Sequence, residues 1–308
     1  MKLRNRTNTR NLSIQHIIDS LIHTLFLLSI TLHMATALNL RNPSTTVMKE
    51  NNERPIIYTF FQMKTRRDGF LDYDGQHEKI LNSWADAWRQ AGWDPRVLTL
   101  EDAKKHKDFK KYSDQFMKLK STDSFIYAGS YNYMCLMRWL AMAALKKNAW
   151  MCDYDTFPLH LTVKDGLILP NDGKFTVYER FVPSLMSGNA EEWDRLAISV
   201  IEKVLEHFDK FGLKETYSDM YALEDVWHSW KKAYISERMV YHFPYSRERK
   251  VDCELTEGIL AFHLSHASTA HARSKGLIPK TTTAENRADL YRILLEDTRQ
   301  QCQYQFVN

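Results

Sequence analysis

The stretch NAWMCDYDTFPL, residues 148–159, indicates the fold class and contains the first candidate for a functional site. Its apolar run, residues 149–152, ends in two carboxylates, Asp153 and Asp155, and a proline follows at position 158. A short continuous apolar run predicts a buried strand, which places these carboxylates at the carboxyl edge of a sheet. Open α/β folds bind ligands at that edge, so we expect a site there.

The regions before this stretch predict a βαβ unit. Residues 56–61 (IIYTFF) are a β-prone run, residues 78–91 (EKILNSWADAWRQA) carry apolar side chains at helical spacing, and residues 95–100 (PRVLTL) alternate as a second strand. Strand, helix and strand in this order indicate parallel pairing. We therefore expect an α/β fold with a Rossmann-like, mixed and mainly parallel sheet flanked by helices.

Further elements are expected around the central run. A Met-rich and Leu-rich helix is predicted for 133–147, a strand for 174–179, and helices for 191–211 and 284–301. Residues 182–189 (VPSLMSGN) are interpreted as a small-residue loop.

Composition and charge exclude two classes of protein. The 308 residues are 44% hydrophobic and 12% aromatic, enough for a large core, which excludes a disordered chain. The formal charge of +4 is concentrated before Asp19, so no nucleic-acid partner is expected. The lysines of 104–120 are mixed with acidic residues and are interpreted as a solvated helical face.

The N-terminal region predicts entry into the secretory pathway. Residues 1–16 form a basic tail and residues 17–40 a largely apolar segment, which is either an uncleaved signal anchor, the interpretation we favour, or a signal peptide. Residues 41–54 are a polar linker, and residues 55–308 are the expected folded domain. The basic tail favours a lumenal domain under the positive-inside rule.

The four cysteines lack CxxC spacing, which argues against a structural zinc site and leaves one or two disulfides open. Cys152 lies in the apolar run beside the aspartates, where a buried free thiol is expected.

Two carboxylates one residue apart on a loop can both reach one hard divalent cation and leave positions open for phosphate oxygens. Asp153 and Asp155 are therefore candidate ligands for Mn²⁺ or Mg²⁺ on a diphosphate.

The block MRWLAMAALKKNAWMCDYDTFPL, residues 137–159, resembles the DxD region of GT-A fold glycosyltransferases related to the yeast α-1,6-mannosyltransferase. The upstream SWADAWRQAGWDPRVLTLEDA, residues 83–103, is similar to a helix and strand of the same families. The resemblance implies that Asp153 and Asp155 bind the metal and diphosphate of a nucleotide sugar. It also implies that Arg138 orients the DxD loop or neutralises the donor, and that Gly188 lines the junction of donor and acceptor, although an ordinary turn is an equal alternative there.

This chain also departs from the family pattern. Tyr131-Asn132 stand where the family has Ser-Asp, and Lys147-Asn148-Ala149-Trp150 where it has Gly-Gly-Xaa-Tyr. Sugar and base specificity are therefore not carried over.

Two later segments supply further candidates. AFHLSHAST, residues 261–269, contains His263 and His266, either of which resembles the late histidine that completes a GT-A metal site; a structural strand histidine is the alternative. YSDMYALEDVWHSW, residues 217–230, contains Asp219, a candidate carboxylate for activating or binding an acceptor hydroxyl. Its alternative is an acidic helix start.

The expected function is transfer of a sugar from a UDP- or GDP-sugar to a glycan, protein or lipid acceptor, with Mn²⁺ or Mg²⁺. The expected location is the Golgi or endoplasmic reticulum membrane, reached through the N-terminal segment, with secretion as the alternative.

A membrane-tethered scaffold that kept the fold without the chemistry is a second hypothesis. A DxD nucleotidyltransferase using Gly129-Ser130 is a weaker one, because a whole helix separates that pair from Asp153. No G-x-S-x-G occurs to suggest a hydrolase.

Overall fold

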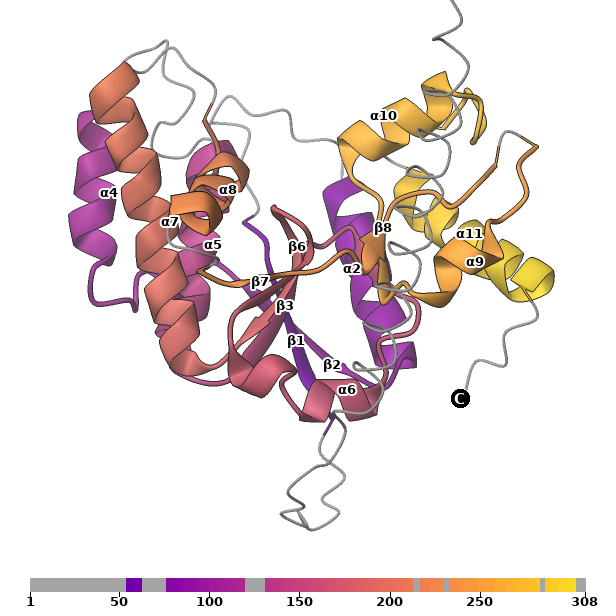
Figure 1. Cartoon of the computed structure of the whole chain (residues 1–308), viewed down its shortest axis with the longest axis horizontal. Helices are drawn as coiled ribbons and strands as arrows, with labels where there is room; N and C mark the ends of the chain where they lie inside the picture. The colour runs from indigo at the N-terminus through magenta and orange to yellow at the C-terminus, as the bar shows by residue number, and fades with distance from the viewer. Residues whose placement is uncertain are drawn as a thin grey trace, which may run out of the picture. The chain divides into compact units, whose positions relative to one another are not determined.

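A mixed six-stranded sheet with the strand order β2-β1-β3-β6-β5-β7 forms the centre of the domain (Figure 1). The computed structural model describes residues 54–62, 76–119, 131–212, 217–229, 233–246, 248–282 and 286–302. The strands are β1 (Ile56–Phe60), β2 (Asp94–Leu98), β3 (Ala149–Cys152), β5 (Thr176–Glu179), β6 (Val182–Gly188) and β7 (Ile235–Ser236).

The directions of the strands determine which ends meet. β1 pairs in parallel with both β2 and β3, and β5 pairs in parallel with β7. β6 is antiparallel to both of its neighbours, β3 and β5. β3 and β5 therefore run in the same direction, and their carboxyl ends lie at the same edge of the sheet.

Helices cover both faces of the sheet (Figure 1). One group contains α3 (Leu100–Ala103), α4 (Phe109–Lys118), α5 (Tyr131–Ala144), α7 (Ala190–Phe211) and α8 (Asp219–Ser229). The other contains α2 (Gln76–Gln90), α9 (Cys253–Glu257), α10 (His266–Ser274) and α11 (Arg287–Cys302). The short helices α6 (Val163–Leu167) and η2 (Asn171–Gly173) connect β4 to β5.

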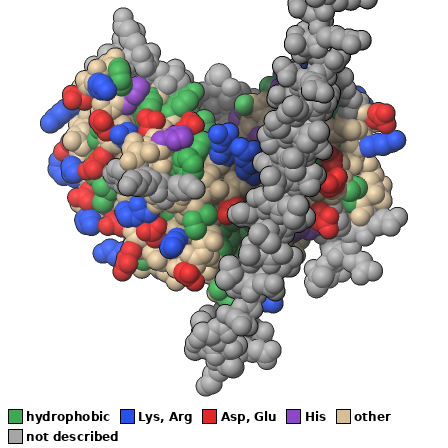
Figure 2. Space-filling view, viewed as in Figure 1, with side chains coloured by type: hydrophobic (Ala, Val, Ile, Leu, Met, Phe, Trp, Pro, Cys, Tyr) green, Lys and Arg blue, Asp and Glu red, His purple; other side chains and the backbone are tan. Residues whose placement is uncertain are grey.

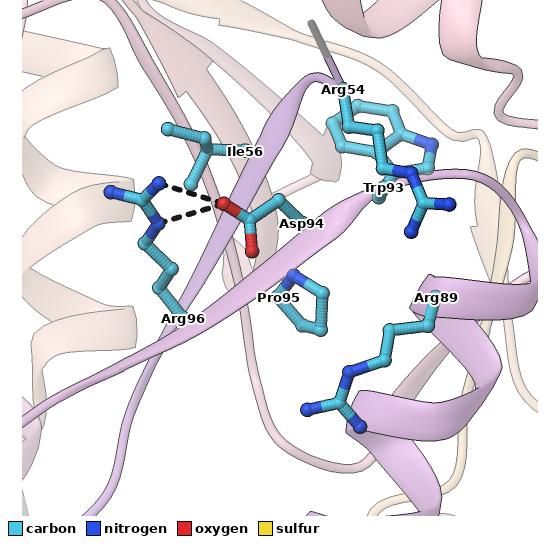
Figure 3. A pocket seen from close by; sticks show the side chains of 7 residues that line it. All are labelled: Arg54, Ile56, Arg89, Trp93, Asp94, Pro95 and Arg96. Atoms are coloured by element: carbon cyan, nitrogen blue, oxygen red, sulfur yellow. Dashed lines mark hydrogen bonds and ion pairs between the residues drawn. The ribbon is translucent and has the colours of Figure 1, made fainter.

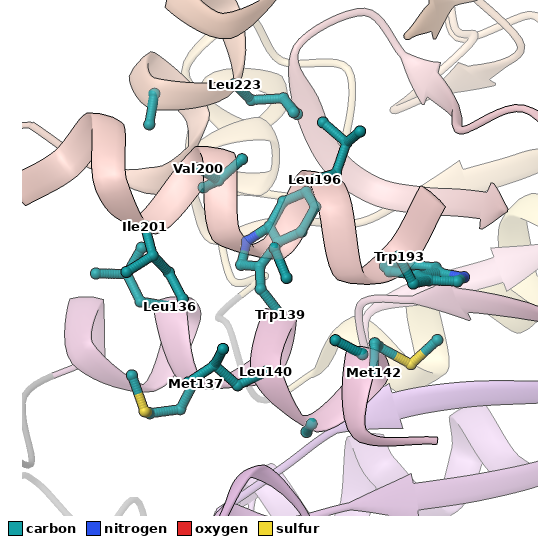
Figure 4. Close-up of a cluster of buried hydrophobic side chains, with 14 of the residues drawn as sticks. Leu136, Met137, Trp139, Leu140, Met142, Trp193, Leu196, Val200, Ile201 and Leu223 are labelled. Atoms are coloured by element: carbon teal, nitrogen blue, oxygen red, sulfur yellow. The ribbon is translucent and has the colours of Figure 1, made fainter. Parts of the chain in front are cut away.

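Alternate residues of the strands enter two separate cores, because successive side chains of a strand point to opposite faces. In β3, Met151 packs into the core formed with α5, α7 and α8, whereas Trp150 and Cys152 pack into the core formed with α2 and α11. Figure 4 shows the first core, where side chains of α5 such as Trp139 meet those of α7 such as Leu196. Burial on both faces explains why β3 is a continuous apolar run rather than an alternating one.

A small second sheet, β4-β9-β8, lies beside the main one. Its strands are β4 (Thr156–Pro158), β8 (Val240–Tyr241) and β9 (Ala261–His263). β4 follows the DxD turn directly and pairs antiparallel with β9, so that Thr156 lies opposite His263. This pairing brings a segment more than one hundred residues later in the chain to the end of β3.

The structure confirms four predicted strands and four predicted helices, with boundaries shifted by up to three residues. The strands were predicted at 56–61, 95–100, 149–152 and 174–179, and the helices at 78–91, 133–147, 191–211 and 284–301. The mixed α/β sheet flanked by helices is also confirmed. The loop predicted for 182–189 is wrong, because β6 occupies Val182–Gly188 between two partner strands. Its Pro183 and Gly188 resemble loop residues, yet the pairing on both sides outweighs local preference.

The lysines of 104–118 lie on an exposed, mixed-charge surface, as predicted for a solvated face. Figure 2 shows acidic and basic side chains interspersed over the region of α4 and α7. Lys110 pairs with Asp114 at 2.6 Å and Lys107 with Asp194 at 3.1 Å.

One disulfide joins the C-terminal elements: Cys253 on α9 bonds to Cys302 at the end of α11. Cys152 is a buried free thiol, as predicted, and Cys135 is also free. Among the described residues, no helix has the length and apolar character needed to cross a bilayer. The predicted segment at 17–40 lies outside the described residues.

Candidate functional site

Side chains from three strand ends meet at the carboxyl edge of the sheet. Asp153 and Asp155 occupy the turn between β3 and β4, closed by a hydrogen bond from the Thr156 amide to the Asp153 carbonyl at 2.9 Å. Glu179 is the last residue of β5. His263 is the last residue of β9 and reaches the same place through the β4–β9 pairing.

Asp153, Asp155 and His263 have the spacing of a metal site. One ligand atom from each residue lies within 4.8 Å of the other two. Ligand atoms on opposite sides of a single divalent ion are about 4 to 5 Å apart, so the group fits one ion. Two carboxylates and an imidazole suit Mn²⁺. The Nε2 atom of His263 and Oδ1 of Asp155 are 3.5 Å apart, longer than an ordinary hydrogen bond.

Arg138 of α5 orients Asp153. Its Nη1 atom donates a short hydrogen bond to Oδ1 of Asp153, and its Nη2 atom donates to Oδ2 of Asp219 at 2.6 Å. The same Oδ2 atom accepts a second hydrogen bond from Nε1 of Trp139 at 3.1 Å. Asp219, the first residue of α8, is therefore a buried anchor for Arg138.

Arg287 of α11 orients Asp155 in the same way. Its Nη1 atom donates to Oδ2 of Asp155 at 2.5 Å and to the carbonyl oxygen of Leu264 at 3.0 Å. Its Nη2 atom lies 3.1 Å from Nε2 of His266. Only 2% of the Arg287 side chain is exposed. Each aspartate of the DxD turn is thus held by a different buried arginine.

The two aspartates have opposite pKa shifts. Burial raises the pKa of Asp153 to about 6, against the opposing effect of Arg138. Burial also acts to raise the pKa of Asp155, but the hydrogen bond and charge of His263 and the charge of Arg287 outweigh it and lower that pKa to about 2. Burial lowers the pKa of His263, and the carboxylates of Glu179 and Asp155 overcome this and raise it well above its ordinary value.

The charges around the site leave room for a cation. The acidic members are Asp153, Asp155, Glu179 and Asp219, and the basic members are Arg138 and Arg287. With His263 protonated, as its raised pKa favours, one negative charge remains unbalanced, and loss of this proton to allow metal ligation leaves two. A divalent cation that displaces the proton would balance these two charges, so the residues present fit such an ion on both geometry and charge.

The structure brings together five of the residues singled out from the sequence: Asp153, Asp155, His263, Arg138 and Asp219. His266 is close by but faces Arg287, and it is not among the described groups with metal-ligand spacing. Gly188 is not brought to the site. It lies opposite Ala149, at the start of β3, whereas Asp153 follows the end of that strand. Gly129 and Ser130 lie outside the described residues.

The role predicted for Asp219 needs revision. Its side chain is only 4% exposed and its Oδ2 atom already accepts hydrogen bonds from Arg138 and Trp139. A carboxylate that is buried and held by a guanidinium group is poorly placed to take a proton from an acceptor hydroxyl. The geometry supports a positioning role instead.

Sequence reasoning missed two members of the site. Glu179 is a carboxylate at the carboxyl end of a predicted strand. Asp153 was identified from the same kind of position, so the same argument would have identified Glu179. Arg287 begins α11 with no neighbouring motif. Its proximity to Asp155, 132 residues earlier, depends entirely on tertiary packing.

A cavity of about 520 Å³ lies at the opposite edge of the sheet, where β1 and β2 begin (Figure 3). It is lined by Arg54, Ile56, Arg89, Trp93, Asp94, Pro95 and Arg96. Arg96 is paired with Asp94 at 2.7 Å. This cavity is separate from the carboxylate cluster, and none of the candidate site residues lines it.

Comparisons with known proteins give one family, and distant structural similarities that include two glycosyltransferases. One is a glycosyltransferase involved in the glycosylation of the major capsid of PBCV-1, with 8% sequence identity, a TM-score of 0.35, and coverage of 72% of this chain and 98% of that chain. The other is the apo-form glycosyltransferase GlyE of Streptococcus pneumoniae TIGR4, with 10% sequence identity, a TM-score of 0.39, and coverage of 79% of this chain and 64% of that chain. These values are too low to transfer an activity. No curated protein sequence matches the chain. Residues 36–232, more than half of the chain, match one family profile, and the protein therefore belongs to the family described as Domain of unknown function (DUF8765).

Proposed function

We propose that this protein is a metal-dependent glycosyltransferase of the GT-A type. It transfers a sugar from a UDP- or GDP-sugar to a glycan, protein or lipid acceptor. The observation that carries the proposal is the group Asp153, Asp155 and His263, with metal-ligand spacing, at the carboxyl edge of the sheet. The DxD block around Asp153, which resembles that of GT-A enzymes, supports the same assignment.

In this proposal Asp153, Asp155 and His263 hold Mn²⁺ or Mg²⁺ together with the donor diphosphate. The bound ion supplies positive charge that stabilises the leaving nucleoside diphosphate. Arg138 and Arg287 each occupy one oxygen of a DxD aspartate, so that Oδ2 of Asp153 and Oδ1 of Asp155 would be the oxygens available to hold the ion. Because both arginines are themselves buried, the ligand oxygens are fixed before the donor arrives.

Arg138 also contributes charge to the site. Its Nε atom is buried and has no hydrogen-bond partner within the described part of the chain. Its guanidinium charge lies beside the carboxylates that would hold the ion. We therefore assign to Arg138 the orientation of Asp153 and partial neutralisation of the charge of the donor diphosphate.

Binding of UDP- and GDP-sugars, with and without Mn²⁺, tests the proposal. Asp153→Asn is the most informative variant, because Arg138 keeps Asp219 as a partner when Asp153 is neutral. We expect Mn²⁺-dependent binding of one donor, and loss of turnover by about 10²-fold or more in the variant. Asp86→Asn, which changes an exposed aspartate on α2, is the matched control and should bind the donor normally.

Two results would contradict the proposal. A folded wild-type protein that binds no donor would favour the non-catalytic scaffold. Metal-dependent binding of nucleoside triphosphates, but of no nucleotide sugar, would favour a nucleotidyltransferase.

We further propose that the domain is lumenal, in the Golgi or endoplasmic reticulum. The disulfide between Cys253 and Cys302 supports this location, because such bonds persist in oxidising compartments and are rare in the cytosol. Protection of the domain from added protease in sealed microsomes would test it. Digestion without detergent would place the domain on the cytosolic side.

A further inference from the structure

We propose that Glu179 is a positioning residue that presents the Nε2 atom of His263 to the metal ion. The inference rests on the proposed metal site and extends it to a residue that is not itself one of the three ligands. Glu179 ends β5 and His263 ends β9, and the two are 84 residues apart in sequence. Their contact is therefore a product of the fold.

The hydrogen bond between the two side chains determines which ring nitrogen is available. Oε2 of Glu179 lies 2.7 Å from Nδ1 of His263. An ionised carboxylate only accepts hydrogen bonds, so Nδ1 carries the proton. In a neutral ring the lone pair is then on Nε2, the nitrogen that faces Asp155. A carboxylate on the second nitrogen of a metal-binding histidine fixes both the tautomer and the ring orientation.

Glu179 is itself held in place. The hydroxyl group of Ser184 on β6 donates a short hydrogen bond to the same Oε2 atom. The pairing of β5 with β6 changes register between Val177 and Glu179. Irregularities of this kind redirect side chains and are frequent next to active sites. Only 12% of the Glu179 side chain is exposed, so water competes weakly for the contact.

A second arrangement could use the same residues. Glu179, His242 and His263 also have metal-ligand spacing. In that arrangement an ion would have to displace the proton shared between Glu179 and Nδ1 of His263. His242 does not exclude this arrangement, because its Nδ1 atom donates to the carbonyl oxygen of His263 at 2.9 Å and leaves Nε2, 3.4 Å from Oε1 of Glu179, available. The hydrogen bond between Glu179 and Nδ1 of His263 favours a single ion on the side of Asp153 and Asp155, and the number of bound ions can be measured.

The test is a thermodynamic cycle on Mn²⁺ affinity in the full-length protein. Free Mn²⁺ is followed by electron paramagnetic resonance, which gives both the affinity and the number of bound ions without any donor or turnover. The variants are Glu179→Ala, His263→Ala and the double variant, with Glu206→Gln, an exposed glutamate on α7, as the control. Circular dichroism confirms that each variant is folded.

We expect one bound ion, and an affinity lowered by about 10- to 100-fold in Glu179→Ala. In the His263→Ala background, removal of Glu179 should have no further effect, because the carboxylate then has no ring to orient. Glu179→Gln keeps an oxygen that can accept from Nδ1 and should recover much of the affinity. This isosteric variant also serves if Glu179→Ala fails to fold.

Four results would overturn the inference, and they can be distinguished. If Glu179→Ala binds Mn²⁺ like the wild type, or weakens binding equally in both backgrounds, Glu179 does not act through His263, yet the metal site stands. Two bound ions would indicate the second arrangement with His242. If the wild type binds no Mn²⁺, the proposed function fails and the role of Glu179 with it.

Discussion

The two aspartates of the DxD turn lie one residue apart and yet have different environments. Asp153 is 25% exposed, has a pKa raised to about 6, and pairs with Arg138, which lies only 15 residues earlier. Asp155 is 10% exposed, has a pKa lowered to about 2, and pairs with Arg287, 132 residues later. Asp155 therefore stays charged across the physiological pH range, whereas the charge of Asp153 can respond to its surroundings.

The partners of the two aspartates come from different parts of the chain. Arg138 and Asp219 lie within the residues that match the family profile, 36–232, whereas His263 and Arg287 lie beyond them. The disulfide between Cys253 and Cys302 closes a loop that contains His263 and Arg287. The two partners of Asp155 therefore lie within one disulfide-closed loop, whereas Arg138 and Asp219 lie outside it.

The largest expected difference between the two halves is in stability. Asp155→Asn leaves the charge of Arg287 buried without its carboxylate partner, which costs about 3 to 5 kcal/mol of unfolding free energy. Asp153→Asn should cost about 1 kcal/mol or less, because Arg138 keeps Asp219 and the replaced carboxylate is partly exposed. Urea unfolding at pH 7 in the presence of EDTA measures both. Equal losses would show that the two pairs are equivalent.

Removal of the disulfide should act on the same half of the molecule. Cys253→Ser combined with Cys302→Ser opens a loop of 49 residues and should lower the free energy of unfolding by about 2 to 4 kcal/mol. The change should also weaken Mn²⁺ binding, because α11 carries Arg287. Cys135→Ser, which removes a free thiol, is the control. Unchanged Mn²⁺ affinity in a folded double variant would show that the disulfide is not needed to form the metal site.

Asp153 and His263, one from each half of the site, should both contribute to the pH dependence of Mn²⁺ binding. Protons and Mn²⁺ compete for the same carboxylate, so affinity falls as the pH falls below the pKa of Asp153, about 6. Between pH 7 and pH 5 this residue alone should lower the affinity by about tenfold. His263, whose raised pKa requires loss of a proton before binding, steepens the dependence. Asp155 adds nothing in this range because its pKa is lowered to about 2.

The Asp153→Asn variant isolates that contribution. Its remaining affinity should change less between pH 7 and pH 5 than that of the wild type, since only His263 still titrates. Titration calorimetry at several pH values measures the slope. If the Mn²⁺ affinity of the variant depends on pH as steeply as that of the wild type, groups other than Asp153 cause the pH dependence.

The smallest effect on stability is expected at an exposed ion pair, which provides a reference value for the buried pairs. Lys110 and Asp114 are 2.6 Å apart on the surface of α4, with 85% and 41% of their side chains exposed. Asp114→Asn should change the free energy of unfolding by about 0.5 kcal/mol or less. A loss as large as that of Asp155→Asn would mean that burial does not explain the difference between the halves.

Much of the fold could be predicted from local patterns. The apolar runs of β1 and β3 and the helical spacing of α2 and α7 identified these elements within a few residues. The 182–189 segment was misassigned because its Pro183 and Gly188 are typical of loops, whereas pairing with β3 and β5 made it a strand. Local propensity is weak compared with the hydrogen bonds and burial available between two partner strands.

The candidate site shows the same division. That Asp153 and Asp155 follow a buried strand could be predicted from the sequence alone, since apolar periodicity and strand length are local properties. Which side chains surround them depends on the tertiary structure. The β4–β9 pairing places His263, and not His266, beside the aspartates. Because β3 and β5 run in the same direction, Glu179 lies close to His263 at the same edge of the sheet. The packing of α11 places Arg287 against Asp155. Contacts between residues 84 or 132 positions apart depend on how strands pair and helices pack, which no local pattern encodes.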